Sequence, residues 1–191
     1  MHALITQGNP LIFAFHGTGG DEHQFAGLTA RLWPGAGIVS PRGMVSEFGA
    51  NRFFRRKAEG VYDMEDLALR TEEMIAFVRR HQTPDVPSFA YGYSNGANIL
   101  AAMTFAAPDL FDRVALLHPL IPFTPSAQPG LAGRRVLITA GRHDPIAPLA
   151  ATQRLEAYYR AQGADVSTTL HGGGHDLRPE EITALQAAFA T

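Results

Sequence analysis

The chain has 191 residues, a formal net charge of −2 and no cysteine. Because a nearly neutral chain has no broad positive field, we expect neither nucleic acid nor an anionic membrane surface as a partner. The missing thiols exclude disulfides, thiolate metal sites and a cysteine nucleophile. The apolar run at residues 11–15 is far shorter than the roughly 20 residues that span a bilayer, so we expect no membrane insertion and a cytoplasmic location.

Short apolar runs alternate along the chain with longer amphipathic ones, and at this length we expect one domain over residues 1–191. The apolar runs predict strands at residues 11–15, 37–40, 88–93, 113–118, 135–140 and 165–170. The amphipathic runs predict helices at residues 21–32, 64–81, 96–106, 148–162 and 179–190. This alternation is typical of a three-layer α/β domain with a mostly parallel sheet, in which ligands bind beyond the carboxyl ends of the strands.

The first predicted strand ends in a glycine-rich loop, "HGTGGDE", at residues 16–22. Its glycines allow backbone amides to turn toward a ligand. In acyl transfer such a loop supplies one donor of an oxyanion hole, and we expect that donor to be the amide of Thr18. A phosphate cradle is the weaker alternative, because neither the Lys-Ser/Thr of a P-loop nor a G-x-G-x-x-G pattern follows.

A long irregular segment, residues 41–63, follows the second predicted strand. Long loops inside compact domains are often functional. We expect this segment to fold over a site, with Phe53 and Phe54 as walls of an acyl pocket and its arginines at the pocket mouth. The alternative is that both phenylalanines are ordinary core residues.

The stretch "GYSNG" lies where the strand at residues 88–93 meets the following helix, and it fits the nucleophile-elbow pattern G-x-S-x-G. The tight turn would project the hydroxyl of Ser94, and the flanking glycines would let the strand and the helix pass closely. A polar turn with a helix-capping serine is the alternative. We expect the Asn95 amide to be the second oxyanion donor, each donor stabilising the transition state by on the order of 3 kcal/mol.

A serine nucleophile requires a base and a group that orients it, in the chain order serine, acid, histidine. Asp144 is the predicted acid, because it follows the strand at residues 135–140 and lies in a loop stiffened by prolines at positions 145 and 148. His175 is the predicted base, because three glycines after the last strand allow its loop to reach Ser94. His171 is the nearest alternative base.

His118 ends another strand at the same edge of the sheet. We expect it to line the substrate pocket, and the alternative is a packed, hydrogen-bonded histidine.

Four motifs, "HGTGGDE", "GYSNGAN", "GRHDPIAP" and "GGGHDL", occur in an order and spacing that resembles the small lidless serine α/β-hydrolases of the phospholipase/carboxylesterase and acyl-protein thioesterase family. Through "SPRG", "RFFRR" and "HPL" the chain is most similar to bacterial carboxylesterases of the methylhydroquinone-responsive type. The resemblance implies an α/β-hydrolase fold with a mostly parallel sheet of about six to seven strands flanked by helices, and no separate cap domain. Acyl-protein thioesterases usually carry Leu and Gln where this chain has Thr18 and Asn95, which argues against protein depalmitoylation.

Together these features predict a serine carboxylesterase that hydrolyses small or short-acyl carboxylic esters through an acyl-enzyme. No cofactor and no metal are expected, and the expected partner is a small-molecule ester. The expected substrate-binding residues are Gly17, Phe53, Phe54, His118 and Leu120. An acyl thioesterase or lysophospholipase is the closest alternative, and a ligand-binding homologue without turnover is the alternative from another class.

Overall fold

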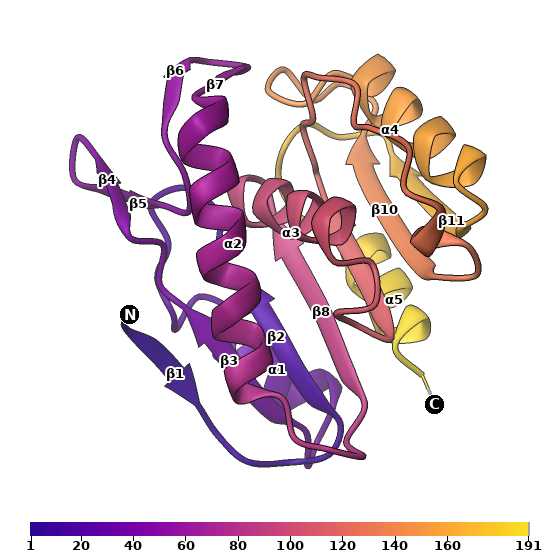
Figure 1. Ribbon diagram of the computed structural model, residues 1–191. Coiled ribbons are helices and arrows are strands. Elements are labelled where there is room, and N and C mark those ends of the chain that lie inside the picture. The colour runs from indigo at the N-terminus through magenta and orange to yellow at the C-terminus, as the bar shows by residue number, and fades with distance from the viewer. Residues whose placement is uncertain (191) are drawn as a thin grey trace.

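A seven-stranded sheet lies between two layers of helices in the computed structural model, which describes residues 1–190 (Figure 1). Across the sheet the strands are β1 (Ala3–Ile5), β3 (Gly37–Pro41), β2 (Leu11–Phe15), β8 (Ser88–Tyr93), β9 (Arg113–Leu117), β10 (Arg135–Gly141) and β11 (Asp165–His171). Only the edge strand β1 pairs antiparallel among these described strands. The predicted mostly parallel α/β architecture is confirmed.

Five α-helices cover the sheet: α1 (Ala26–Leu32), α2 (Met64–His81), α3 (Asn95–Ala106), α4 (Leu149–Ala161) and α5 (Pro179–Ala188). Successive residues of β2 point to opposite faces, so Phe13 joins the core under α2, α3 and α4, while Ile12 joins the core under α1 and α5. Both side chains are fully buried. This two-sided burial is why β2 reads as a continuous apolar run.

The segment at residues 41–63 forms two hairpins, β4 (Val45–Glu47) with β5 (Ala50–Arg52) and β6 (Arg56–Ala58) with β7 (Val61–Tyr62). In Figure 1 they lie toward the end of the molecule to which the parallel strands point. The prediction of an irregular loop here was wrong, because strands of two or three mostly polar residues carry too little periodicity to be recognised. The edge strand β1 was missed because it has only three residues, too few to show a pattern, although all three are apolar.

The helix predicted from residue 21 begins only at Ala26. The Asp21 carboxylate accepts a hydrogen bond from the His23 amide at 2.9 Å, which holds the intervening residues in a turn instead.

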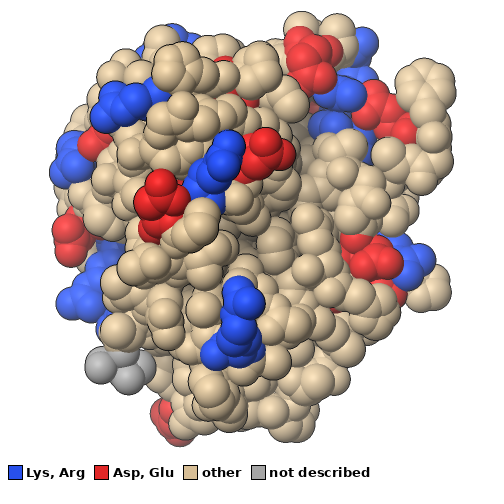
Figure 2. All heavy atoms as spheres, turned by 180° about the vertical axis from the view of Figure 1, so that it is seen from behind, with Lys and Arg blue, Asp and Glu red and all other residues tan. Residues whose placement is uncertain are grey.

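The face turned away from the viewer of Figure 1 carries basic and acidic side chains in scattered, mixed groups (Figure 2). No helix within residues 1–190 is both long enough and apolar enough to cross a membrane. That residues 1–191 form one domain stays a prediction, and Thr191 lies outside the described residues.

Candidate active site

Ser94 occupies a strained turn between β8 and α3, with φ 53° and ψ −117°. A Cβ added to Gly92 would lie 2.5 Å from the Gly96 backbone, and one added to Gly96 would lie 2.2 Å from the Phe15 carbonyl oxygen. Only glycine fits at either position. The strand and the helix therefore approach as closely as the elbow pattern predicts.

The structure brings together three residues that lie far apart in the sequence, from the loops that follow β8, β10 and β11. His175 Nε2 lies 2.9 Å from Ser94 Oγ, and His175 Nδ1 lies 2.6 Å from Asp144 Oδ2. With the Nδ1 hydrogen donated to the carboxylate, Nε2 is free to accept the serine proton.

Asp144 is held as a carboxylate. Burial opposes its ionisation, yet hydrogen bonds from the Ala147 amide, His118 and His175 lower the pKa of Asp144 below its usual value. Its second oxygen, Oδ1, accepts from the amides of Ile146 and Ala147 at 2.8 and 2.9 Å. These bonds fix the direction in which the carboxylate faces His175.

Within residues 1–190 the backbone amides of Thr18 and Asn95, on either side of Ser94, have no protein hydrogen-bond acceptor. In the Thr18 loop, the Gly17 amide donates to Gln24 and the Gly19 amide donates to Asn51, both at 2.9 Å. The Asn95 amide begins α3, where first-turn amides have no intrahelical acceptor. Thr18 and Asn95 line the same cavity as Ser94, so both amides are available to an anionic oxygen there.

The β4–β5 hairpin and the residue after it hold both of these positions. Arg52 Nη1 donates to Thr18 Oγ1 at 2.9 Å, and the Phe53 amide donates to Asn95 Oδ1 at 2.7 Å. Asn51 Nδ2 also donates to the Gly20 carbonyl at 2.9 Å. The segment beginning at residue 41 thus ties the glycine-rich loop to the start of α3.

A cavity of about 270 Å³ opens beside Ser94 and His175. Charged side chains contribute to its wall, namely those of Arg52, Arg56 and Glu59. Tyr62 and Leu120 also line it, and the Tyr62 hydroxyl donates to the Leu120 carbonyl.

The prediction that Phe53 and Phe54 wall this cavity is corrected by the structure. Within residues 1–190 neither ring is among those that line it; their exposed fractions are 2% and 0%, and both belong to the core under α2. Phe53 packs on Phe15, with ring centroids 5.7 Å apart. Gly17 likewise is not among the lining residues, although its neighbour Thr18 is.

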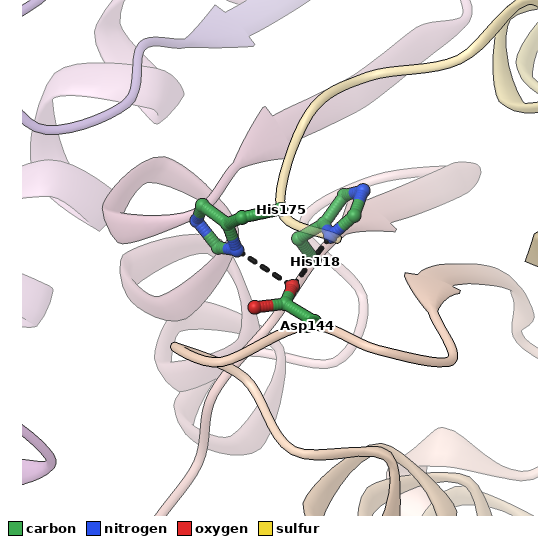
Figure 3. A group of neighbouring side chains, drawn as sticks. All are labelled: His118, Asp144 and His175. Atoms are coloured by element: carbon green, nitrogen blue, oxygen red, sulfur yellow. Dashed lines mark hydrogen bonds and ion pairs between the residues drawn. The ribbon is translucent and has the colours of Figure 1, made fainter. Parts of the chain in front are cut away.

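His118 borders the cavity but is fully buried, and it contacts Asp144 instead of standing free as a pocket wall. Figure 3 shows His118 and His175 on either side of the carboxylate, with hydrogen bonds to the same oxygen. His118 Nδ1 lies 2.8 Å from Asp144 Oδ2. His118 is therefore both among the residues that line the cavity, as predicted, and a packed, hydrogen-bonded histidine.

Glu181, on the first turn of α5, was missed by sequence reasoning. Its carboxylate is buried and lies 3.0 Å from His118 Nε2 and 3.1 Å from His171 Nε2. A glutamate in the first turn of a helix is an ordinary feature, so the sequence carries no signal of this contact. His171, the alternative base, faces Glu181 and not Ser94.

No protein-family model matches the chain. It is 39% identical over 175 residues to "Putative hydrolase MhqD" of Bacillus subtilis (strain 168), which covers 90% of this chain and 88% of that relative. The structure of a Bacillus cereus carboxylesterase matches with a TM-score of 0.89 at 33% identity, covering 97% of this chain and 91% of that one. The protein Atu2452 of Agrobacterium tumefaciens str. C58, described as of unknown function, matches with a TM-score of 0.85 at 49% identity, covering 96% and 91%. These matches extend over nearly the whole of each chain and leave no room for a separate cap domain.

Proposed function

We propose a function from one premise: the chain belongs to the phospholipase/carboxylesterase family of α/β-hydrolases. Its α/β-hydrolase fold and its hydrolytic, carboxylesterase-type function follow from its relatives. The finer proposal is a serine carboxylesterase that hydrolyses small or short-acyl carboxylic esters through an acyl-enzyme on Ser94.

In the proposed reaction, His175 Nε2 takes the hydroxyl proton of Ser94 while Oγ attacks the ester carbonyl carbon. The amides of Thr18 and Asn95 donate to the oxyanion of the tetrahedral intermediate. His175 then gives its proton to the alcohol oxygen as the bond between that oxygen and the carbonyl carbon breaks. The alcohol departs, and the acyl group remains as an ester on Ser94. A water molecule, deprotonated by His175, attacks that ester. When the second intermediate collapses, the bond to Ser94 Oγ breaks, Oγ takes the proton back from His175, and the carboxylic acid is released.

The observation that carries the proposal is the unbroken hydrogen-bonded chain from Ser94 Oγ through His175 to Asp144, at 2.9 and 2.6 Å. It supports proton transfer without any rearrangement of the site. The size of the cavity, about 270 Å³, and the charged groups in its wall favour small, polar esters over long acyl chains.

Labelling with a fluorophosphonate tests the nucleophile. We expect mass spectrometry to find one adduct on the peptide that contains Ser94, and no adduct in heat-denatured protein. Native protein without an adduct, or with an adduct elsewhere, would contradict the proposal and favour a ligand-binding homologue without turnover.

A substrate series tests the class of ester. We expect kcat/KM to fall in the order p-nitrophenyl acetate, butyrate and decanoate, and to be lower for acyl-CoA thioesters than for the short esters. A preference for acyl-CoA, or for long-chain lysophospholipid, would favour the thioesterase or lysophospholipase alternative instead.

A further inference from the structure

The proposed reaction uses one histidine, His175, yet the Asp144 carboxylate forms hydrogen bonds with two histidines. Asp144 Oδ2 accepts from His175 Nδ1 at 2.6 Å and from His118 Nδ1 at 2.8 Å. His118 is fully buried, and within residues 1–190 no hydrogen bond joins its ring to Ser94. Its φ of 53° is unfavourable for a residue with a side chain, so the fold holds it in this position at some cost in energy.

His118 lies between two carboxylates. Its Nδ1 faces Asp144, and its Nε2 lies 3.0 Å from Glu181 Oε1. An ionised carboxylate can only accept hydrogen bonds, so a His118 ring that donates to both carboxylates carries a hydrogen on each nitrogen. His118 Nε2 also lies 3.4 Å from His171 Nε2, and a hydrogen bond donated by His171 to that nitrogen would instead leave His118 neutral. Burial opposes the charge, but the hydrogen bonds to Glu181 and Asp144 raise the pKa of His118 above its ordinary value.

The remaining contacts of Glu181 agree with this assignment. The Gly173 amide donates to His171 Nδ1 at 3.0 Å, so His171 Nε2 carries the hydrogen that faces Glu181 Oε2 at 3.1 Å. The Thr139 hydroxyl and the Arg178 amide donate to Glu181 as well, at 2.5 and 2.7 Å. Although burial opposes the ionisation of Glu181, the bonds from His118 and Thr139 lower the pKa of its carboxyl group.

We propose that His118 is a positioning residue, an imidazolium held between Asp144 and Glu181. It fixes the orientation of the Asp144 carboxylate, and its positive charge offsets part of the attraction between that carboxylate and a proton on His175. The inference rests on the proposed function of Ser94 and His175. The ring centroids of His118 and His175 are 5.1 Å apart, a distance at which two positive charges repel strongly inside a protein. The charge on His118 thus opposes a second positive charge on His175.

The titratable groups that face His118 come from every element packed against it. Burial raises the pKa of Tyr93 to about 12, so its phenol is neutral. The charge around His118 is therefore set by the carboxylates and the histidines. These groups are Tyr93 of β8, Asp144 after β10, His171 and His175 at and after the end of β11, and Glu181 of α5.

Nitrogen-15 NMR of the histidine rings tests the charge directly and requires no turnover. We expect one ring to keep both nitrogens protonated at about pH 8, where a free imidazole is neutral. The signals should vanish in the His118→Asn, Glu181→Gln double variant and persist in His2→Asn, which removes an exposed histidine. A neutral His118 under these conditions would overturn the proposal.

The pH profile of kcat/KM tests the consequence for His175. The double variant keeps an N–H donor near Asp144 and removes the buried charges of His118 and Glu181 together. Because Asp144 then attracts a proton on His175 more strongly, we expect the acid limb of the profile to move to higher pH by on the order of one pH unit. His2→Asn should leave the limb in place. An unmoved or lowered limb in the double variant would refute the inference, and Ser94 labelling would show separately whether the proposed function still stands.

A metal offers a different explanation of the same cluster, because ligand atoms of His118, His171 and Glu181 all lie within 4.8 Å of one another. A metal would replace the ring hydrogens that the proposal requires. Elemental analysis of the purified protein decides the point. We expect no stoichiometric metal, and one bound metal ion per chain would overturn the proposal.

Discussion

Ser94 combines chemistry and backbone strain in one residue. Its φ of 53° and ψ of −117° are angles that glycine adopts more readily than any residue with a side chain. The turn is maintained because β8 and α3 are fixed on both sides and the Ser94 amide donates to the Leu117 carbonyl at 2.9 Å. The strain is therefore stored where the hydroxyl must project.

Substitutions at Ser94 separate these two properties. Ser94→Ala should reduce hydrolysis of p-nitrophenyl acetate to the background rate while the protein stays folded. Ser94→Gly should be equally inactive but more stable than the alanine variant by about 1 kcal/mol, because glycine relieves the strained φ. Urea denaturation measures the difference. Undiminished turnover in either variant would remove Ser94 as the nucleophile, and equal stability of the two would remove the strain argument.

At the scale of elements, the closeness of α3 to the sheet depends on a glycine. A Cβ at Gly96 would lie 2.2 Å from the Phe15 carbonyl oxygen, whereas a Cβ at Gly27 in α1 meets no atom within 4 Å. The same substitution should therefore have opposite effects in two helices of one protein.

We expect Gly96→Ala to destabilise the fold by more than about 3 kcal/mol, since the clash is with backbone and cannot be relieved by a rotamer change. Gly27→Ala should be neutral or stabilise the protein by up to about 1 kcal/mol, through the better helix propensity of alanine. Thermal and urea denaturation of both variants provide the measurement. A tolerated Gly96→Ala would show that α3 can move away from β2.

The β4–β5 hairpin acts on the site through Arg52, whose side chain is 5% exposed and bonded to Thr18. Because the proposed oxyanion donors must be placed accurately, Arg52→Gln should lower kcat by about tenfold with a smaller change in KM. Arg55→Gln is the matched control, since that side chain is 60% exposed and its buried partner Asp66 keeps Arg70 at 3.4 Å. Similar kcat values for the two variants would contradict a positioning role for the hairpin.

At the scale of the whole molecule, two cores share one sheet, and we propose that residues 1–191 unfold as a single domain. Trp33, the only tryptophan, packs on Tyr91 and Phe189 in the core under α1 and α5, so its fluorescence reports on that side of the sheet. Far-ultraviolet circular dichroism reports on all helices.

We expect the urea transitions followed by the two signals to coincide, as in a two-state domain of this size. Buried strands such as β2 contribute side chains to both cores, so neither core can lose its packing alone. Separate midpoints would mean that one helical layer unfolds before the other.

Features that depend on neighbouring residues, namely the strands, the helices and the turn around Ser94, could be predicted from the sequence. Six strands of the main sheet were predicted as apolar runs, and α2 was predicted with its observed bounds, because burial imposes a short period on neighbouring positions. The elbow around Ser94 was recognisable because its two glycines are required by local backbone geometry. The order of Ser94, Asp144 and His175 along the chain, together with their places after strands, was enough to predict that they would meet.

Only the tertiary structure decided which other groups meet them. It buried Phe53 and Phe54 in the core, formed hairpins from short polar strands, and placed His118 between Asp144 and Glu181. These outcomes depend on the strand order of the sheet and on how α5 packs beneath it. Contacts between side chains distant in sequence leave no periodicity in the chain, and so the second histidine on Asp144 became visible only in three dimensions.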